Sequence, residues 1–177
     1  DAWLAEQIIE HDPEIDQQEV DVEEECLKIL ALHQPVAGDL RFIVSVLKIN
    51  NDLERIGDLA VNIAERAVYL AGQNNEDIPF DFYEMGRAAR QMVRSSLDAL
   101  VNIDSELARE VCGSDDYVDN LNRQMFEMVK SQIREKPERI DALIHLLNIS
   151  RHLERIGDLA TNIAEDVIYL VEGVIVR

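Results

Sequence analysis

Two nearly identical stretches decide the fold of this chain: residues 53–65 read LERIGDLAVNIAE and residues 153–165 read LERIGDLATNIAE. Twelve of the thirteen positions match, at an offset of 100. Such self-similarity at a fixed offset indicates two copies of one structural unit. A weaker upstream echo at an offset of 103 pairs Leu4, Ala5, Asp12, Ile15 and Asp16 with Leu107, Ala108, Asp115, Val118 and Asp119.

Apolar residues in both copies recur at steps of three and four, which predicts helices with one buried face. In the first copy the series is Leu53, Ile56, Ala60, Ile63, Ala67 and Leu70, and the second copy repeats it from Leu153 to Leu170. Each copy has room for three helices. We therefore predict an all-α fold of two tandem three-helix bundles, with six helices in total. Residues 1–73 form the first repeat in this prediction, and residues 80–177 form the second.

Turn-forming residues predict where these helices begin and end. Asp12 before Pro13 is typical of an N-cap followed by proline, which predicts a helix over about 13–33. Pro35 and Pro137 predict the turns into the long third helices, and residues 72–79 (GQNNEDIP) predict the loop between repeats. A further helix is expected over about 81–111, and residues 113–114 are expected to separate it from the next helix.

We expect the first helix of repeat one to be truncated. Repeat two has over twenty predicted helical residues ahead of Asp104, the counterpart of Asp1. We therefore expect the natural protein to start earlier and an apolar groove to remain on repeat one. Intact-mass data on a full-length product without extra N-terminal residues would contradict this expectation.

The formal charge of -19 argues against nucleic acid and anionic membrane surfaces as partners and favours cations and basic protein patches. Cys26 and Cys112 lie far apart in apolar stretches, as expected of reduced thiols in a cytoplasmic protein. The sequence contains no uncharged run near the roughly 20 residues that a membrane helix needs. The first residues also lack the basic and apolar pattern of a signal segment.

Pairs of carboxylates four residues apart recur in both copies. The pairs are Asp12/Asp16, Glu54/Asp58, Asp115/Asp119 and Glu154/Asp158. Two antiparallel helices bring residues level when their numbers are symmetric about the connecting turn. In repeat one, the residue numbers 16 and 54, and likewise 12 and 58, average 35, which is the position of Pro35. In repeat two, 119 and 154, and likewise 115 and 158, average 136.5, next to Pro137. The sequence thus predicts one quartet of carboxylates in each repeat.

Four carboxylates at one height repel one another, so a cation is expected among them. All-oxygen ligands suit hard ions such as Mg, Mn, Ca or Fe, and zinc is a further candidate. Asn62 and Asn162 follow Asp58 and Asp158 by four residues, so they lie on the same helix face as the carboxylates. They are added to the predicted ligands. The alternative is an ordinary solvated acidic flank, in which Asp12 serves only as a helix cap and Arg55 and Arg155 neutralise part of the charge.

The segments ECLKILALHQPVAGDLRFIVSVLKINNDLERIGDLAVNIAE (25–65) and LLNISRHLERIGDLATNIAE (146–165) resemble the two halves of the PhoU family. The resemblance implies two three-helix bundles with metal ions, iron or zinc first and magnesium or manganese as alternatives, at up to one site or cluster per repeat. It also implies a cytoplasmic, homodimeric regulator that restrains phosphate uptake. Its expected partners are the ATPase subunit of the phosphate ABC transporter and a phosphate-sensing histidine kinase. Glu19 in repeat one corresponds to Asn122 in repeat two, so the residues beside the two predicted sites differ.

Two other functions compete with this one. Helical bundles with inward carboxylates also house di-metal oxidases, but these need Glu-x-x-His pairs and no Glu here has a His three residues on. No Ser, Cys or Lys stands beside an obvious base, so no enzyme is expected. The second rival is a metal-free helical adaptor whose carboxylates are only surface.

Overall fold

The computed structural model describes residues 1–73 and 80–174, and every regular element in these ranges is helical. The elements are α1 (Ala2–His33), α2 (Gly38–Ala71), α3 (Phe82–Asn102), α4 (Ser105–Glu135), the short 3-10 turn η1 (Pro137–Arg139) and α5 (Ile140–Glu172). The prediction of an all-α fold is confirmed. The described residues contain five α-helices rather than six, since repeat one is a two-helix hairpin.

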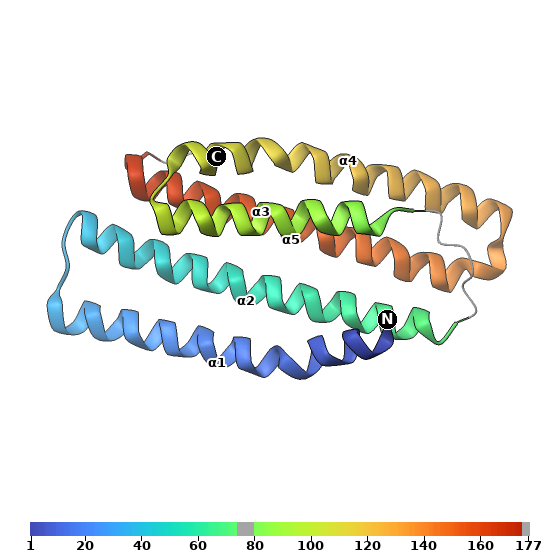
Figure 1. Cartoon of the computed structure of the whole chain (residues 1–177), viewed down its shortest axis with the longest axis horizontal. Coiled ribbons are helices and arrows are strands. Elements are labelled where there is room, and N and C mark those ends of the chain that lie inside the picture. The colour runs from blue at the N-terminus through green and yellow to red at the C-terminus, as the bar shows by residue number, and fades with distance from the viewer. Residues whose placement is uncertain (74–79, 175–177) are drawn as a thin grey trace.

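The helices lie side by side along one long axis (Figure 1). The chain folds back between α1 and α2, and again between α4 and α5, so each pair is an antiparallel hairpin. Helix α3 packs on both α4 and α5, and α2 packs against α5. The α2 and α5 helices are antiparallel, because Lys48 near the start of α2 meets Asp166 near the end of α5, while Tyr69 stacks on His145 at the opposite end.

The predicted helix start at Asp12 is wrong. Helix α1 runs without interruption from Ala2 to His33 and contains Pro13 in its interior. Its N-cap is Asp1, whose side chain accepts a hydrogen bond from the Leu4 amide. Proline inside a helix removes one backbone hydrogen bond and bends the helix. Figure 1 shows that bend in the N-terminal part of α1, which still packs on α2.

The predicted break at Gly113 and Ser114 is also wrong, because α4 continues through both residues. The Ser114 hydroxyl donates to the Glu110 carbonyl, so it is satisfied within the helix. The chain turns earlier, at Ile103, which has a left-handed backbone (φ 54°), and Asp104 caps α4. Asp1 and Asp104 are therefore equivalent N-caps at the offset of 103 that the sequence predicted.

The turns at Pro35 and Pro137 are confirmed, since neither lies within an α-helix and each precedes a long one. The predicted loop over 72–79 lies mostly outside the described residues. No helix in 1–73 or 80–174 is long and apolar enough to cross a membrane.

Burial is unequal between the two repeats. Helix α4 buries six residues, whereas α1 buries only Ala5 and Cys26. Helix α3 covers the α4–α5 hairpin, and no described element covers α1–α2 in the same way. The most exposed large apolar side chains of repeat one are Trp3, Leu4, Leu27, Leu32 and Val36. The expected groove stays a prediction.

Candidate metal centre

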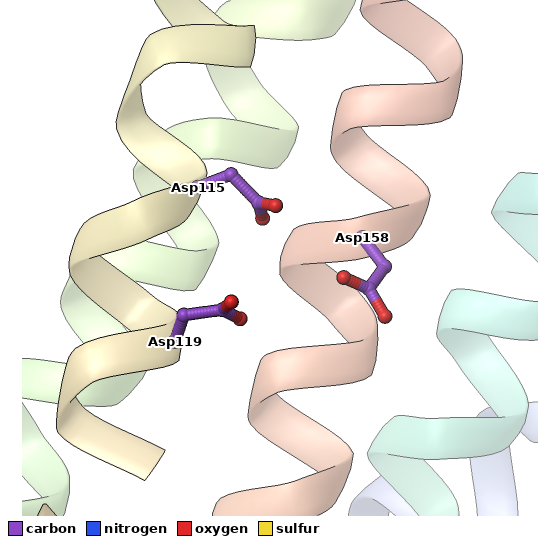
Figure 2. A group of neighbouring side chains, drawn as sticks. All are labelled: Asp115, Asp119 and Asp158. Atoms are coloured by element: carbon purple, nitrogen blue, oxygen red, sulfur yellow. The ribbon is translucent and has the colours of Figure 1, made fainter. Parts of the chain in front are cut away.

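Three aspartates meet between α4 and α5. One carboxylate oxygen each of Asp115, Asp119 and Asp158 lies within 4.8 Å of the other two. Figure 2 shows Asp115 and Asp119 one turn apart on α4, with both side chains directed toward α5, which carries Asp158. In the part of the chain that the structure describes, this is the one group of three or more such side chains.

The charges of this cluster oppose one another. Burial raises the pKa of Asp115, and the charges of Asp158 and Asp119 raise it further. Burial likewise raises the pKa of Asp158, with a second contribution from Asp119. The pKa of Glu154 rises for the same two reasons, burial first and then Asp158 and Asp119. The four predicted residues of repeat two therefore form one electrostatic unit, although Glu154 lies outside the tight group of three.

The quartet of repeat one is also brought together, but more loosely. Burial and then the charges of Asp16 and Asp58 raise the pKa of Asp12. Burial and then Asp58, Asp16, Glu19 and Asp12 raise the pKa of Glu54. Asp16 is exposed, whereas its counterpart in repeat two is half-buried. The level arrangement about the prolines holds in both hairpins.

A glycine on each long helix lies against the facing helix of its hairpin, beside the carboxylates. A Cβ atom on Gly157 would lie 3.5 Å from Asp115 Oδ1 and 3.7 Å from Val118 Cγ1. A Cβ atom on Gly57 would lie 3.3 Å from Ile15 Cγ2. Ile15 and Val118 are equivalent at the offset of 103, so both hairpins use the same contact.

Asn62 and Asn162 face the space between the repeats. They line a pocket of about 350 Å³ between α2 and α5. The pocket is built from two equivalent sets of residues: Arg55, Asp58, Leu59 and Asn62, and Arg155, Asp158, Leu159 and Asn162. The Asn62 amide donates to the Asp58 carbonyl over 2.8 Å, so part of its polar capacity serves the backbone. Both asparagines stay predicted metal ligands.

Thr161 was missed by the sequence reasoning. Its hydroxyl opposes the rise in the pKa of Asp115, but neither Thr161 Oγ1 nor Asp115 Oδ1 completes a hydrogen bond, and both atoms are buried. The signal was available, since position 161 is the one mismatch in the thirteen-residue repeat, with Val61 as its counterpart.

The family model for the PhoU domain matches residues 1–67 and again residues 82–167. The chain belongs to the PhoU family. A PhoU homolog from Aquifex aeolicus is 44% identical over 178 residues, which span 98% of this chain and 79% of the relative. A homolog from Clostridium acetobutylicum is 39% identical over 174 residues, with 98% and 80% covered. Both carry the name phosphate-specific transport system accessory protein.

Solved PhoU structures share the fold. The crystal structure of PhoU from Pseudomonas aeruginosa matches with a TM-score of 0.92 at 41% identity, covering 98% of this chain and 84% of that one. The regulatory protein PhoU from Streptococcus pneumoniae matches with a TM-score of 0.91 at 30% identity, covering 100% and 83%. The family resemblance expected from residues 25–65 and 146–165 is confirmed.

The donor set in repeat two fits a hard cation. Its ligand atoms are carboxylate oxygens, which Mg, Mn, Ca and Fe ions prefer and which zinc also accepts. Asp115 Oδ1 is buried without a hydrogen-bond partner. A buried, unpartnered carboxylate oxygen is unfavourable unless something positive lies beside it.

We expect the metal-free chain to gain stability as the pH falls from neutral through the raised pKa values of the repeat-two carboxylates. In the folded state the pKa values of Asp115, Glu154 and Asp158 lie above their ordinary values of 3.8 for Asp and 4.5 for Glu. The folded chain then binds protons before the unfolded chain does, so acidification through the raised pKa values favours folding. Urea unfolding with a chelator at constant ionic strength measures this.

The control for this pH effect is the variant Asp115→Asn/Asp158→Asn. Its stability should depend less steeply on pH, because two of the three groups no longer titrate. An identical pH slope in both proteins would assign the effect to the overall charge of -19 instead.

Proposed function

We propose that this chain is an accessory protein of phosphate transport that restrains phosphate uptake and holds metal ions on its carboxylate quartets. The observation that carries the regulatory role is membership of the PhoU family over both repeats. The relatives named above are accessory proteins of a phosphate-specific transport system.

The metal ions are proposed to bind at one site or cluster per repeat. In repeat two the ligands are Asp115, Asp119, Asp158, Glu154 and Asn162, and in repeat one they are Asp12, Asp16, Glu54, Asp58 and Asn62. Mutual charge repulsion within each quartet supports this proposal, because a bound cation relieves it. Iron or zinc are the first candidates, with magnesium or manganese as alternatives. A bound ion would supply positive charge that fixes α4 against α5 and α1 against α2.

The regulation is proposed to run through protein contacts in the cytoplasm. The chain would link the ATPase subunit of the phosphate ABC transporter to the phosphate-sensing histidine kinase, acting as a homodimer and repressing the phosphate regulon. A net charge of -19 suits basic surfaces on protein partners and disfavours nucleic acid. We propose no catalytic role.

Two alternatives keep the same fold and differ in the use of the carboxylates. A di-metal oxidase would turn over in a metal-dependent way, and a plain adaptor would bind no metal. Elemental analysis after metal-free purification and readdition separates them from the proposal, together with an oxidase assay.

The regulatory role is tested in cells grown with ample phosphate. Deleting the gene for this chain should raise alkaline phosphatase activity and phosphate uptake, because repression is lost. Restoring the gene should reverse both effects. The same gene with Asp115→Asn/Asp158→Asn should restore less repression if metal binding serves regulation. Normal repression in the deletion strain would contradict the proposed role.

A further inference from the structure

A groove between α4 and α5 lies beyond the aspartate cluster, toward the turn that joins these two helices at one end of the molecule (Figure 1). Its cavity of about 470 Å³ is lined by residues of these two helices alone: Asn122, Arg123, Phe126, Glu127, Leu147 and Arg151. Asn122 follows Asp119 by three residues on α4, and Arg151 precedes Glu154 by three on α5. The groove therefore continues the face that carries the carboxylates.

The apolar side chains of this groove are partly open to solvent. The Phe126 side chain is 49% exposed. Leu147 is half-buried and packs against the core of the α4–α5 hairpin. Ile140 and Ile144 precede Leu147 on the same face of α5 and are 42% and 45% exposed. Several exposed apolar side chains in a row indicate a binding surface, whereas single ones do not.

The charged groups that line the groove leave two arginines without an ion pair. Lys130 Nζ lies 2.9 and 3.0 Å from the two carboxylate oxygens of Glu127, so the one carboxylate of the lining is already neutralised. Arg123 and Arg151 form no ion pair within 4.0 Å in residues 1–73 and 80–174. Burial and then two aspartates raise the pKa of Glu154, and Arg151 lowers it without a direct contact.

An equivalent contact identifies the same place in repeat one. The Asn50 amide of α2 donates to the Glu19 carbonyl of α1 over 2.8 Å. In repeat two the Ser150 hydroxyl of α5 donates to Asn122 Oδ1 of α4. Positions 50 and 150 differ by 100 and positions 19 and 122 differ by 103, so both hairpins pair in the same register here.

The equivalent place in repeat one is acidic and has no aromatic ring. Its residues, in the same order as those of the groove, are Glu19, Val20, Glu23, Glu24, Leu47 and Asn51. Residues 123–136 include four basic and two acidic residues, a net charge of +2, whereas residues 20–33 include one basic and four acidic residues, a net charge of -3. The same hairpin forms in repeat one, so its fold does not require the two arginines and the phenylalanine of repeat two.

We propose that the α4–α5 groove docks an acidic segment of a partner protein. A large apolar side chain of that segment lies between Phe126 and Leu147, and its carboxylates pair with Arg123 and Arg151. Arginine offers a carboxylate two parallel N–H donors, and aromatic residues and arginines are enriched among the residues that contribute most to binding.

The charge of the whole chain determines where such a segment binds. A net charge of -19 repels acidic segments from most of the surface, so this basic groove is the exception that accepts them. The surface is separate from the proposed metal ligands. The proposal does not depend on the regulatory role.

A display library of random peptides of about 12 residues, panned against the full chain, tests the proposal. Chelator is present throughout, so that peptide carboxylates cannot bind through a metal ion. Peptides rich in Asp and Glu with one Leu, Phe or Trp should be enriched. Fluorescence anisotropy with the most enriched peptide should show saturable binding that Arg123→Gln and Arg151→Gln each weaken roughly tenfold, because each removes a charged partner. Phe126→Ala should weaken it by a similar factor or more.

Two controls accompany these measurements. Arg94→Gln removes an arginine of α3 that lies outside the groove in an exposed pair with Asp98, 3.8 Å away, and it should leave the affinity unchanged. The same peptide with Gln and Asn in place of Glu and Asp should bind at least tenfold more weakly. Arg123, Phe126 and Arg151 are all exposed, so their substitutions should leave the Tm measured by circular dichroism unchanged.

Enrichment of peptides without a surplus of Asp and Glu would overturn the proposal, and so would binding that survives all three groove substitutions. A second copy of the chain is the competing occupant, because α1 is strongly acidic. Sedimentation velocity distinguishes the two. Self-association that Phe126→Glu abolishes would assign the groove to a second copy and overturn the proposal, whereas an unchanged sedimentation profile would support a different partner protein.

Discussion

Replacing Asp158 with Asn should lower the affinity of the repeat-two cluster for a divalent metal roughly a hundredfold and, at the same time, raise the Tm of the metal-free chain. Loss of a group that merely orients a ligand already costs about 10- to 100-fold in metal affinity. Asp158 is one of the three aspartates whose oxygens lie within 4.8 Å of one another, so its loss should reach the upper end of that range. Asn keeps the shape of the side chain and removes its charge.

The substitution should weaken metal binding and yet stabilise the metal-free chain, and these opposite effects have one physical cause. Without metal, burial and the charge of Asp119 raise the pKa of Asp158, so its charge is less favourable in the folded chain than in the unfolded chain. Neutralising it relieves that repulsion, and only a bound cation makes the charge useful. Calorimetric titration with Mn²⁺ or Zn²⁺ measures the first effect, and thermal unfolding with chelator measures the second.

Asp98→Asn is the matched control for this substitution. Asp98 lies on α3 in an exposed pair with Arg94, 3.8 Å away, and pairs of that kind contribute little. Neither the metal affinity nor the Tm should change beyond error. If Asp158→Asn bound metal as tightly as the unmodified chain, the cluster would have to be regarded as plain acidic surface.

Replacing Ile163 with Ala should lower the free energy of unfolding by about 3 kcal/mol, because Ile163 is completely buried and the methyl groups it loses leave a cavity. Ile63 occupies the same position in repeat one but is only half-buried. Ile63→Ala should therefore cost less, about 1–2 kcal/mol. Urea unfolding of the three proteins followed by circular dichroism measures the difference.

This pair of substitutions isolates the effect of tertiary packing from that of sequence. Both isoleucines lie in the same thirteen-residue motif, so local helix propensity changes equally in the two variants. Equal losses of stability would mean that α1–α2 is packed as tightly as α4–α5, contrary to the structure.

Several features could be predicted because they depend only on the spacing of residues along the chain. The offset between the two motifs gives the internal repeat, and steps of three and four between apolar residues give helices. The carboxylate pairs meet because each hairpin turns at a proline, Pro35 or Pro137, midway between them. The two errors, at Pro13 and at residues 113–114, share one cause. In each case a residue that locally disfavours a helix lies inside a long helix, α1 or α4, that packs along its whole hairpin partner.

The sequence by itself determined an all-helical PhoU chain in two copies, together with the carboxylates that face each other across each hairpin, since helical rise and turn position settle both. Only the tertiary structure decided how the copies differ. Antiparallel packing of α2 on α5 sets Asp52 near Asp166 at one end and His152 near Arg66 at the other. Such pairings join residues about a hundred positions apart, and no local pattern specifies them, because they arise from which faces of the two hairpins are buried together.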